Sequence, residues 1–207
     1  MSTRCVHAFD FDGTLTTKDT LIEFIRYACG TRVLLLGLLR HSLLLVAMKL
    51  HLYANYKAKQ RVFAHFFAGM PLVRFNELCR AFARQGGGLL RPAAVQTVQK
   101  ALQSGAEVLI VSASIDNWVR AFLPYFGADG TDTARISVLG TQVETNEQGL
   151  LTGHFASNNC YGAEKVRRIT AHCGDRSSYK LTAYGDSRGD KEMLMYADQA
   201  FFRPFRR

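Results

Sequence analysis

Short apolar runs and longer helical segments alternate along this chain. Strand signals fall at Cys5–Phe9, Glu107–Val111 and Leu181–Tyr184, and small or acidic residues follow each of them. Segments of helical composition, such as Pro92–Gln103 and Lys191–Ala197, accompany these strand signals. Strands that alternate with helices predict an α/β fold built on an open parallel sheet.

Residues 136–155 have a different pattern. Their sequence, ISVLGTQVETNEQGLLTGHF, alternates in part around a polar Thr-Asn-Glu-Gln-Gly turn. This pattern predicts a β-hairpin, placed either as an appendage or at a sheet edge.

The stretch from Asp19 to Arg84 interrupts the α/β pattern. It is rich in Leu, Phe, Lys and Arg, contains one proline and shows no strand alternation. We therefore expect residues 19–84 to form a helical cap inserted into a core made of residues 1–18 and 85–207. Thr16–Lys18 and Gln85–Gly88 would be the paired connections, although a triple glycine is also typical of an ordinary loop.

Within this insertion, Val33–Leu52 is apolar and nearly long enough to span a bilayer. Arg40, His41 and Ser42 interrupt its centre, and a central arginine costs roughly 2.5 to 3.5 kcal/mol on insertion scales. The pattern predicts two short apolar helices instead of a membrane span. Two uses of leucines such as Leu38 and Leu45 stay open, namely packing the cap's own core and facing lipid.

The charge balance favours anionic partners. Among 207 residues, 26 Lys and Arg exceed 17 Asp and Glu by nine, which suits phosphorylated metabolites, nucleic acid or an acidic membrane surface. Lys57, Lys59 and Arg61 can meet anionic head groups, or they can be a solvated face. No nucleic-acid-binding module is recognisable, so we expect no nucleic-acid partner.

Cysteine usage and the N-terminus both indicate a cytoplasmic protein. The five cysteines are widely spaced and contain no CxxC pair, so neither a disulfide framework nor a zinc site is predicted. The N-terminus runs directly into a strand-like segment without the basic and apolar regions of a signal peptide.

The residues that follow the predicted strands carry the candidate chemistry. Asp10 and Asp12 follow the first strand, and Asp186 and Asp190 follow the last. Ligands in open α/β sheets bind at the carboxyl ends of strands. Four carboxylates gathered there need a cation, and Mg²⁺ prefers carboxylate oxygens.

A carboxylate can also attack phosphorus and form an aspartyl phosphate. Phosphoryl transfer further requires charge neutralisation and hydrogen-bond donors around the transferred group. Ser112, in VLIVSAS, can supply a hydroxyl donor, and Lys165, in NNCYGAEKVRR, can supply the positive charge.

Together these motifs resemble the haloacid dehalogenase superfamily. DFDGT corresponds to the family's first motif DxDx[TV], Ser112 ends the second, Lys165 is the third and GDSRGD matches the fourth, in the required order. The resemblance implies a Rossmann-like core. The gap between Asp12 and Ser112 is similar to the helical cap of the phosphoserine phosphatase-like branch, subfamily IB. Within that branch the motifs look most like a bacterial subgroup that includes phosphatidylglycerophosphate phosphatase C.

The resemblance also implies the role of each residue. Asp10 would be the nucleophile, and Asp12 would protonate the leaving oxygen and then activate water. Mg²⁺ would be bound by Asp10, Asp186 and the backbone carbonyl of Asp12, while Asp190 orients the metal shell. The remaining two, Ser112 and Lys165, would hold the phosphoryl oxygens.

Each motif taken singly has an ordinary structural explanation. DFDGT can be a strand followed by an Asp-Gly turn, Asp190 can cap a helix, Ser114 can be an N-cap, and Lys165 can be a surface lysine. Their joint occurrence in order favours a Mg²⁺-dependent phosphatase.

The sequence leaves the substrate open. A phospholipid head-group phosphate is one candidate, with peripheral contact at the inner face of the membrane. A soluble metabolite of the phosphoserine type is the alternative. It is weakened because Asp19 stands where phosphoserine phosphatases usually carry Glu and no counterpart of their carboxylate-binding Arg is visible. A non-catalytic membrane- or partner-binding module is a remote alternative, since such a module has no need of Asp12.

Overall fold

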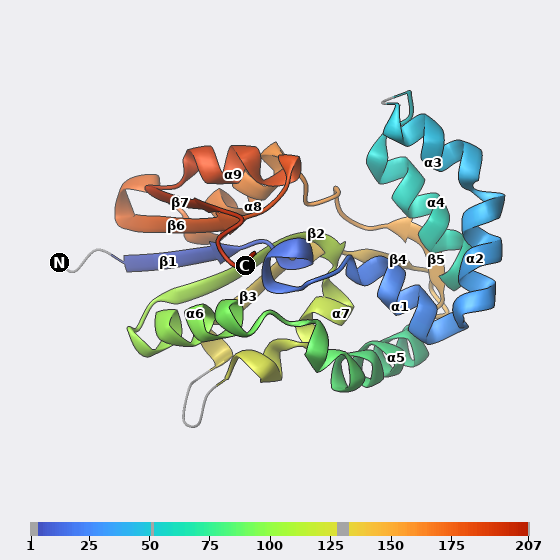
Figure 1. Cartoon of the computed structure of the whole chain (residues 1–207), viewed down its shortest axis with the longest axis horizontal. Helices are drawn as coiled ribbons and strands as arrows, with labels where there is room; N and C mark the ends of the chain where they lie inside the picture. The colour runs from blue at the N-terminus through green and yellow to red at the C-terminus, as the bar shows by residue number, and fades with distance from the viewer. Residues whose placement is uncertain (1–3, 51, 128–132, 207) are drawn as a thin grey trace.

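The three predicted strand segments lie side by side in one parallel sheet of the computed structural model, which describes residues 4–50, 52–127 and 133–206. The strand order is β3-β2-β1-β6-β7, and every neighbouring pair is parallel (Figure 1). The strands are β1 (Arg4–Phe9), β2 (Glu107–Ile115), β3 (Ile136–Thr141), β6 (Tyr179–Gly185) and β7 (Gln199–Phe202). The prediction of a parallel α/β sheet is confirmed.

Helices cover both faces of this sheet. Alternate residues of β2 point to opposite sides, so that Val108 packs on one face and Leu109 on the other. The first face is covered by α6 (Pro92–Gln103) and α7 (Asp116–Ala121), and the second by α8 (Ala163–Cys173) and α9 (Lys191–Tyr196). Because β2 is buried on both sides, its continuous apolar run is typical of a central parallel strand.

Five helices occupy the segment predicted as an insertion. They are α1 (Thr20–Cys29), α2 (Thr31–Arg40), α3 (Ser42–Lys49), α4 (Asn55–Phe67) and α5 (Leu72–Gln85), on the right of Figure 1. Phe24 is central to their packing, since its ring contacts Phe67, Phe75 and Trp118.

The chain leaves and re-enters the core at one place. The backbone N–H of Thr17 donates to the carbonyl of Leu89 at 2.8 Å, and that of Arg91 donates to Leu15 at 2.8 Å. The segments before α1 and after α5 therefore lie side by side, bonded through Leu89 and Arg91 just beyond the predicted Gln85–Gly88, and the glycines form the short 3₁₀ turn Gly86–Leu89.

The hairpin predicted over residues 136–155 is shorter than expected. Ile136–Thr141 pairs in parallel with β2 as the edge strand, so the predicted placement at a sheet edge is confirmed for this segment, whereas its assignment to a hairpin arm is wrong. Only β4 (Val143–Thr145) and β5 (Leu151–Phe155) form an antiparallel pair. Local alternation cannot distinguish a hairpin arm from a sheet edge, because the partner strand comes from another part of the chain.

This small hairpin packs on the inserted helices. Gly69 donates its N–H to the carbonyl of Leu151 at 2.8 Å, and Leu151 donates to Met70 at 2.9 Å. Gly153, with φ of +87°, lies so close to α4 that an added Cβ would stand 2.6 Å from the Cβ of Ala64. The β4-β5 hairpin therefore packs against helix α4, although the two are more than sixty residues apart in sequence.

Two short helices replace a single apolar one, as predicted. Helices α2 and α3 meet at His41 with a bend of 65°. Across the described residues, no single helix is long and apolar enough to cross a membrane, and this bent pair alone meets the length and composition criteria when taken together.

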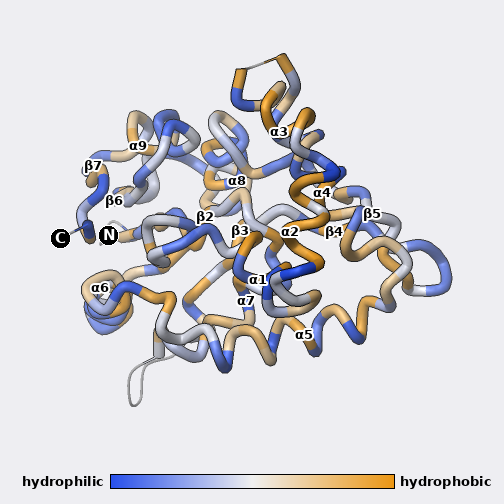
Figure 2. Tube along the Cα trace, turned by 45° about the vertical axis from the view of Figure 1, so that its right-hand side comes forward, coloured by the Kyte–Doolittle hydropathy of each residue, from blue (hydrophilic) through white to orange (hydrophobic). Residues whose placement is uncertain are grey.

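Helices α2 and α3 are rich in hydrophobic residues (Figure 2), and many of these side chains are exposed. Leu43 is 85% exposed, and the other exposed side chains in this stretch are Val33, Leu35, Leu36, Leu39, Val46, Leu50 and Leu52. Leu38 and Leu45 are not among them, because both are partly buried against the core. Of the two uses left open for these two leucines, packing inside the protein is the one observed.

We predict that Gly153→Ala destabilises the protein by at least about 2 kcal/mol, because the methyl group adds a clash to the strain of a positive φ. Gly149 is the matched control, since its φ is +73° and nothing lies within 4 Å of an added Cβ. Gly149→Ala should cost only about 1 kcal/mol. Urea denaturation of both variants measures the difference, and equal losses would contradict tight packing of the hairpin on α4.

Candidate active site

The predicted site residues converge at the carboxyl ends of the central strands. Asp10 directly follows β1, Ser112 lies in the last part of β2, and Asp186 directly follows β6. Lys165 reaches them from the first turn of α8, and Asp190 from the turn before α9. The sheet order β2-β1-β6 brings these strand ends together.

The ammonium group of Lys165 is buried at the centre. Its Nζ donates to Asp10 Oδ1 and Asp190 Oδ1, both at 2.6 Å, and to the carbonyl of Val111 at 2.7 Å. All three of its protons are thus used. Burial opposes the charge, yet the carboxylates of Asp10 and Asp190 raise the pKa of Lys165. The lysine therefore stays charged, and it is not a surface residue.

Three carboxylates form a candidate metal centre. Oxygen atoms of Asp10, Asp186 and Asp190 lie within 4.8 Å of one another. The second oxygen of Asp190 already accepts from Asp186 N at 3.1 Å, Ser187 N at 2.9 Å and Ser187 Oγ at 2.8 Å. Asp10 and Asp186 are thus better placed to turn an oxygen toward a cation. Hard carboxylate oxygens of this kind suit Mg²⁺.

Asp12 points away from that cluster. Its Oδ1 accepts from the N–H and the hydroxyl of Thr20 at 2.7 and 2.6 Å, and its Oδ2 accepts from the hydroxyl of Ser114. The indole N–H of Trp118 donates to Thr20 Oγ1 at 3.1 Å. The two aspartates of DFDGT therefore have separate environments, and the Asp12 side chain is not part of the three-carboxylate cluster.

Gly13 allows the first and fourth motifs to approach each other. Its φ is +80°, and an added Cβ would lie 2.5 Å from Asp186 Oδ2. The hydroxyl of Thr14 then bridges the two motifs, at 3.3 Å from Asp10 Oδ2 and 3.4 Å from Asp186 Oδ1.

The serines of β2 complete the polar part of the site. Ser112 Oγ accepts from the N–H of Ser114 at 3.0 Å and lines the cavity. Ser114 is not a helix N-cap, since β2 continues to Ile115 and α7 begins at Asp116. The supporting roles of Thr14, Thr20 and Ser114 were missed, because no spacing rule links positions so far apart in sequence.

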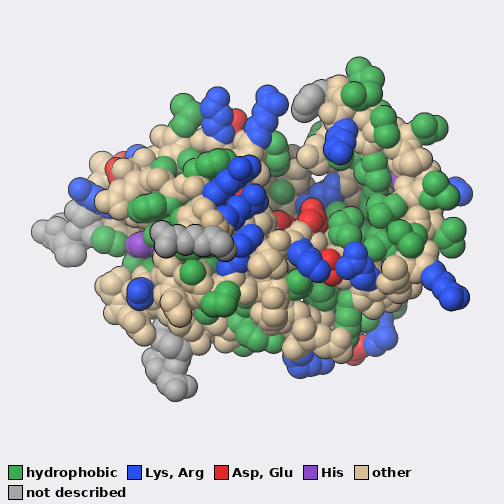
Figure 3. All heavy atoms as spheres, viewed as in Figure 1, with side chains coloured by type: hydrophobic (Ala, Val, Ile, Leu, Met, Phe, Trp, Pro, Cys, Tyr) green, Lys and Arg blue, Asp and Glu red, His purple; other side chains and the backbone are tan. Residues whose placement is uncertain are grey.

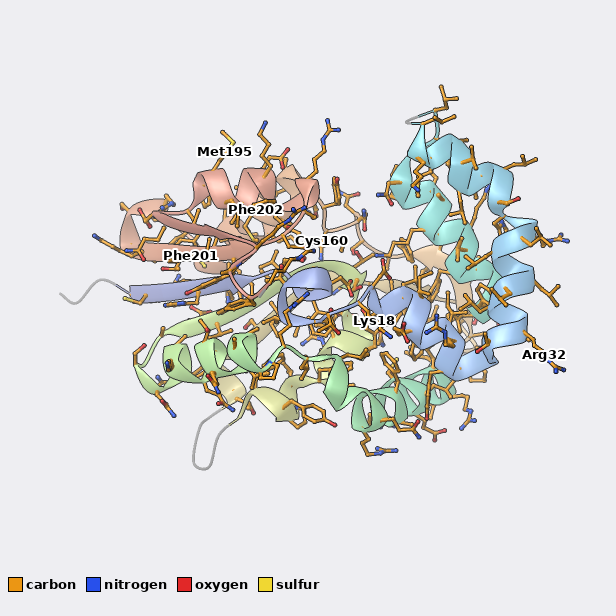
Figure 4. All side chains as sticks on the ribbon, viewed as in Figure 1. Lys18, Arg32, Cys160, Met195, Phe201 and Phe202 are labelled. Carbon is orange, nitrogen blue, oxygen red and sulfur yellow. The ribbon has the colours of Figure 1, made fainter. Side chains whose placement is uncertain are left out.

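A cavity of about 520 Å³ opens above these groups, and its lining divides into two parts. The floor holds the carboxylates, Ser112 and Lys165. Helices α1 to α4 supply the apolar part of the wall, formed by Leu21, Ile22, Leu38, Leu45, Met48 and Val62, and α4 adds the polar side chains of Asn55 and Lys59. Lys18, labelled in Figure 4 where α1 meets the core, lines the same cavity.

Lys59 projects from α4 into this cavity. Its Nζ donates to the carbonyl of Ala113 at 2.6 Å. Burial lowers the pKa of Lys59, and the nearby carboxylates of Asp12 and Asp19 act in the opposite direction. The sequence grouped it with Lys57 and Arg61, which are exposed, so its place in the site was missed.

Arg206, near the C-terminus, also reaches the site. Its guanidinium pairs with Asp186 Oδ2, and Arg203 Nε donates to the carbonyl of Asp186 at 3.0 Å. Phe205 stacks against Tyr184 with ring centroids 5.8 Å apart, which anchors the segment. The sequence contained no signal for this contact.

The sequence model of the haloacid dehalogenase-like hydrolases matches residues 8–195. The chain therefore belongs to that family, and it is an enzyme of the phosphatase type. Residues 8–195 contain all six predicted site residues, so the family match and the strand-end cluster concern the same part of the chain.

Two curated relatives are similar over most of this chain. Protein CicA from Caulobacter vibrioides (strain NA1000 / CB15N) is 36% identical over 203 residues, covering 96% of this chain and 86% of the relative. A phosphoserine phosphatase from Polaromonas sp. is 28% identical over 193 residues, covering 90% of this chain and 73% of the relative.

Solved structures share the fold at low identity. A protein with unknown function from Bordetella pertussis Tohama I has a TM-score of 0.77 at 20% identity, covering 94% of this chain and 87% of that one. A substrate-bound phosphoserine phosphatase has a TM-score of 0.64 at 16% identity, covering 98% and 87%.

The buried aspartates have opposite effects on stability. Burial raises the pKa of Asp10 to about 7 despite the adjacent Lys165. The folded state therefore holds this proton more tightly than the unfolded state does, and stability is lost as pH rises through about 7. Burial acts in the same direction on Asp190, but Lys165 and the Ser187 donors outweigh it and lower the pKa of Asp190.

We predict that Asp10→Asn raises the free energy of unfolding at pH 8 by on the order of a few kcal/mol, with a smaller gain at pH 5. Asp190→Asn should instead destabilise the protein at both pH values. The pKa of Asp190 is lowered in the folded state, so at pH 5 and at pH 8 the group is a carboxylate whose interaction with Lys165 stabilises the fold. Thermal unfolding in buffer with chelator measures both. A loss of stability in Asp10→Asn at pH 8 would contradict the burial argument.

Proposed function

We propose that the protein is a Mg²⁺-dependent phosphomonoesterase that forms an aspartyl phosphate on Asp10, with residues 19–84 serving as a cap over the core of residues 1–18 and 85–207. One observation carries this proposal. Asp10 and Asp12 lie two residues apart, yet one carboxylate joins Lys165 and the acidic cluster while the other is held by Thr20 and Ser114. Two carboxylates in different environments suit two different roles.

In this mechanism the Asp10 oxygen attacks phosphorus while the bond to the ester oxygen breaks. Asp12 acts as the general acid that gives a proton to the leaving oxygen. It then accepts a proton from the water that attacks the acyl phosphate, which releases inorganic phosphate and restores Asp10. Ser112 and Lys165 hold the phosphoryl oxygens and oppose their charge.

The donor set fits Mg²⁺, which Asp10, Asp186 and the backbone carbonyl of Asp12 would hold, with Asp190 orienting them from behind. When bound, the cation would neutralise charge on the transferred phosphoryl group. Arg206 pairs with Asp186 Oδ2, which leaves Asp186 Oδ1, 3.4 Å from the Thr14 hydroxyl, as the oxygen that could face a cation.

The cavity favours an ester whose alcohol part is apolar or joined to an apolar group. Six apolar side chains of α1 to α4 form part of its wall, and α2 and α3 also carry exposed leucines. A phospholipid head-group phosphate, such as that of phosphatidylglycerophosphate, combines these properties. The enzyme would then act at the cytoplasmic face of the membrane, in peripheral contact with it.

One observation favours a soluble amino-acid phosphate instead. Asp19 and Lys59 line the cavity with opposite charges, and such a pair can bind an ammonium and a carboxylate group. The named phosphoserine phosphatases agree with this alternative. Both groups already have partners inside the protein, which weakens this alternative. The Asp19 carboxylate caps α1, and the Lys59 ammonium donates to the Ala113 carbonyl.

We expect Mg²⁺-dependent hydrolysis of p-nitrophenyl phosphate, lost on chelation and in Asp10→Asn. The nucleophile itself is identified by rapid quenching and mass spectrometry, which should find phosphate on the peptide containing Asp10. Ser114→Ala is the informative companion, because it loosens Asp12 and should lower kcat about tenfold or more while Mg²⁺ affinity is kept. Full activity with excess chelator would contradict the site.

We also expect binding to vesicles that contain anionic lipid. Apolar side chains contribute about 25 cal/mol of favourable binding free energy per Å² removed from water, and each Lys or Arg near an anionic membrane surface adds about 1 kcal/mol. The variant Leu35→Ser/Leu36→Ser/Leu39→Ser should lose vesicle binding and lipid turnover but keep p-nitrophenyl phosphate hydrolysis.

The matched control for that variant is Val73→Ser/Met195→Ser, which removes two exposed apolar side chains from α5 and α9. Met195 points outward from α9 in Figure 4. Vesicle sedimentation compares the two variants with the parent protein. No binding by the parent would favour the soluble alternative.

A further inference from the structure

Trp118 places a polar N–H in the fully buried interior beside the candidate active site. It is the single tryptophan of the chain and lies in α7. Its ring stacks on that of Phe24 with centroids 5.0 Å apart, and its indole N–H donates to Thr20 Oγ1 at 3.1 Å. Because a buried donor needs a partner, this bond fixes how the indole and the Thr20 side chain face each other.

The bond from Trp118 also sets the direction of the Thr20 hydroxyl proton. A hydroxyl has one proton and two lone pairs, and an indole N–H can only donate. Thr20 Oγ1 therefore accepts from Trp118, and its own proton is free for another group. Asp12 Oδ1 lies 2.6 Å away, whereas Ser114 Oγ lies at 3.4 Å. The proton of Thr20 is thus directed at Asp12.

Both oxygens of the Asp12 carboxylate are held by buried donors. Oδ1 accepts from the N–H and the hydroxyl of Thr20, the first residue of α1, and Oδ2 accepts from the hydroxyl of Ser114 in β2. Ser114 in turn donates its N–H to Ser112 Oγ at 3.0 Å. The carboxylate is therefore fixed directly from α1 and β2, and from α7 through Thr20.

The side chains that hold Asp12 are separated from the cavity. Figure 3 shows acidic side chains at the hollow between the α9 side and the α3 side of the molecule. Asp12 lines the active-site cavity, but Thr20, Ser114 and Trp118 do not, and all three are fully buried. A substrate in the cavity can therefore meet Asp12 without meeting the side chains that hold it.

We infer that Trp118 is a positioning residue for Asp12 and acts through the hydroxyl of Thr20. The inference rests on the proposed function, in which Asp12 gives a proton to the leaving oxygen. Such a transfer needs the donor within hydrogen-bond reach of that oxygen, and it slows when the donor can rotate away. Without the indole N–H, the Thr20 hydroxyl can turn its proton from Asp12 to Ser114, which releases one of the bonds that hold the carboxylate.

Two aryl phosphates of similar shape separate this role from general damage to the site. p-Nitrophenolate leaves without a proton, whereas the more basic phenolate needs one, so a misplaced general acid slows phenyl phosphate selectively. Thr20→Val removes the hydroxyl at similar size. We expect kcat/KM, which covers formation of the acyl phosphate only, to fall about tenfold or more for phenyl phosphate and less than about threefold for p-nitrophenyl phosphate. Thr20→Ser keeps the hydroxyl and should keep both values.

The indole N–H can also be removed without changing the shape of the side chain. Because Trp118 is the only tryptophan, growth on benzothienylalanine, which carries sulfur in place of the N–H, replaces this position alone. The substituted protein should lose about threefold or more in kcat/KM toward phenyl phosphate and keep its kcat/KM toward p-nitrophenyl phosphate. The same replacement made in Thr20→Val should add no further loss, because both changes act through one hydroxyl.

Tyr125→Phe is the matched control, since it removes a hydroxyl that donates to the carbonyls of Ala83 and Arg84 outside the cavity. It should leave kcat/KM for both esters unchanged. Equal losses for the two esters in Thr20→Val would overturn the inference, and so would an unchanged ratio of the two kcat/KM values in the benzothienylalanine protein. Absence of hydrolysis of both esters by the parent protein would instead reject the proposed function, and the positioning role with it.

Discussion

The buried ammonium of Lys165 is the interaction on which the site depends. It joins the end of β1, a carbonyl of β2 and the turn before α9 through three hydrogen bonds of 2.6 to 2.7 Å. Asp10 and Asp190 are themselves almost fully buried, and two such carboxylates without a cation would carry a cost of several kcal/mol each. The lysine balances part of that charge before any metal or substrate binds.

The loops that carry the acidic cluster need glycine at two positions, because a side chain there would collide with the carboxylates. Gly13 and Gly185 both stand where a Cβ would lie 2.5 Å from an atom of Asp186 or Asp190. The glycines of DFDGT and GDSRGD therefore serve close approach between motifs, in addition to turning the chain. Carboxylates held close together repel each other and so lower the folding stability of the protein. Enzymes commonly accept this loss where charge must be preorganised for phosphoryl transfer.

The sheet and helices α1 to α4 contribute different side chains to the same cavity. The residues after the strands supply charge at fixed distances, whereas α1 to α4 supply apolar side chains, one inward lysine and an outer surface rich in leucine. The charged groups therefore belong to sequence motifs, whereas the apolar lining comes from helices that carry no such motif. This division explains why the reaction type could be inferred from motifs while the substrate could not.

The sequence by itself determined the parallel α/β architecture, the helical character of residues 20–85 and the break at His41, because these depend on local periodicity and on charges within an apolar run. It also predicted six residues that line one cavity beside the strand ends, since a parallel sheet brings those ends to one edge. Only the tertiary structure decided that Ile136–Thr141 joins the sheet, that Lys59 and Arg206 enter the site, and that Leu38 turns inward while Leu39 stays exposed. Each of these depends on a partner far away in sequence, and local pattern contains no information about which distant segment will cover a given side chain.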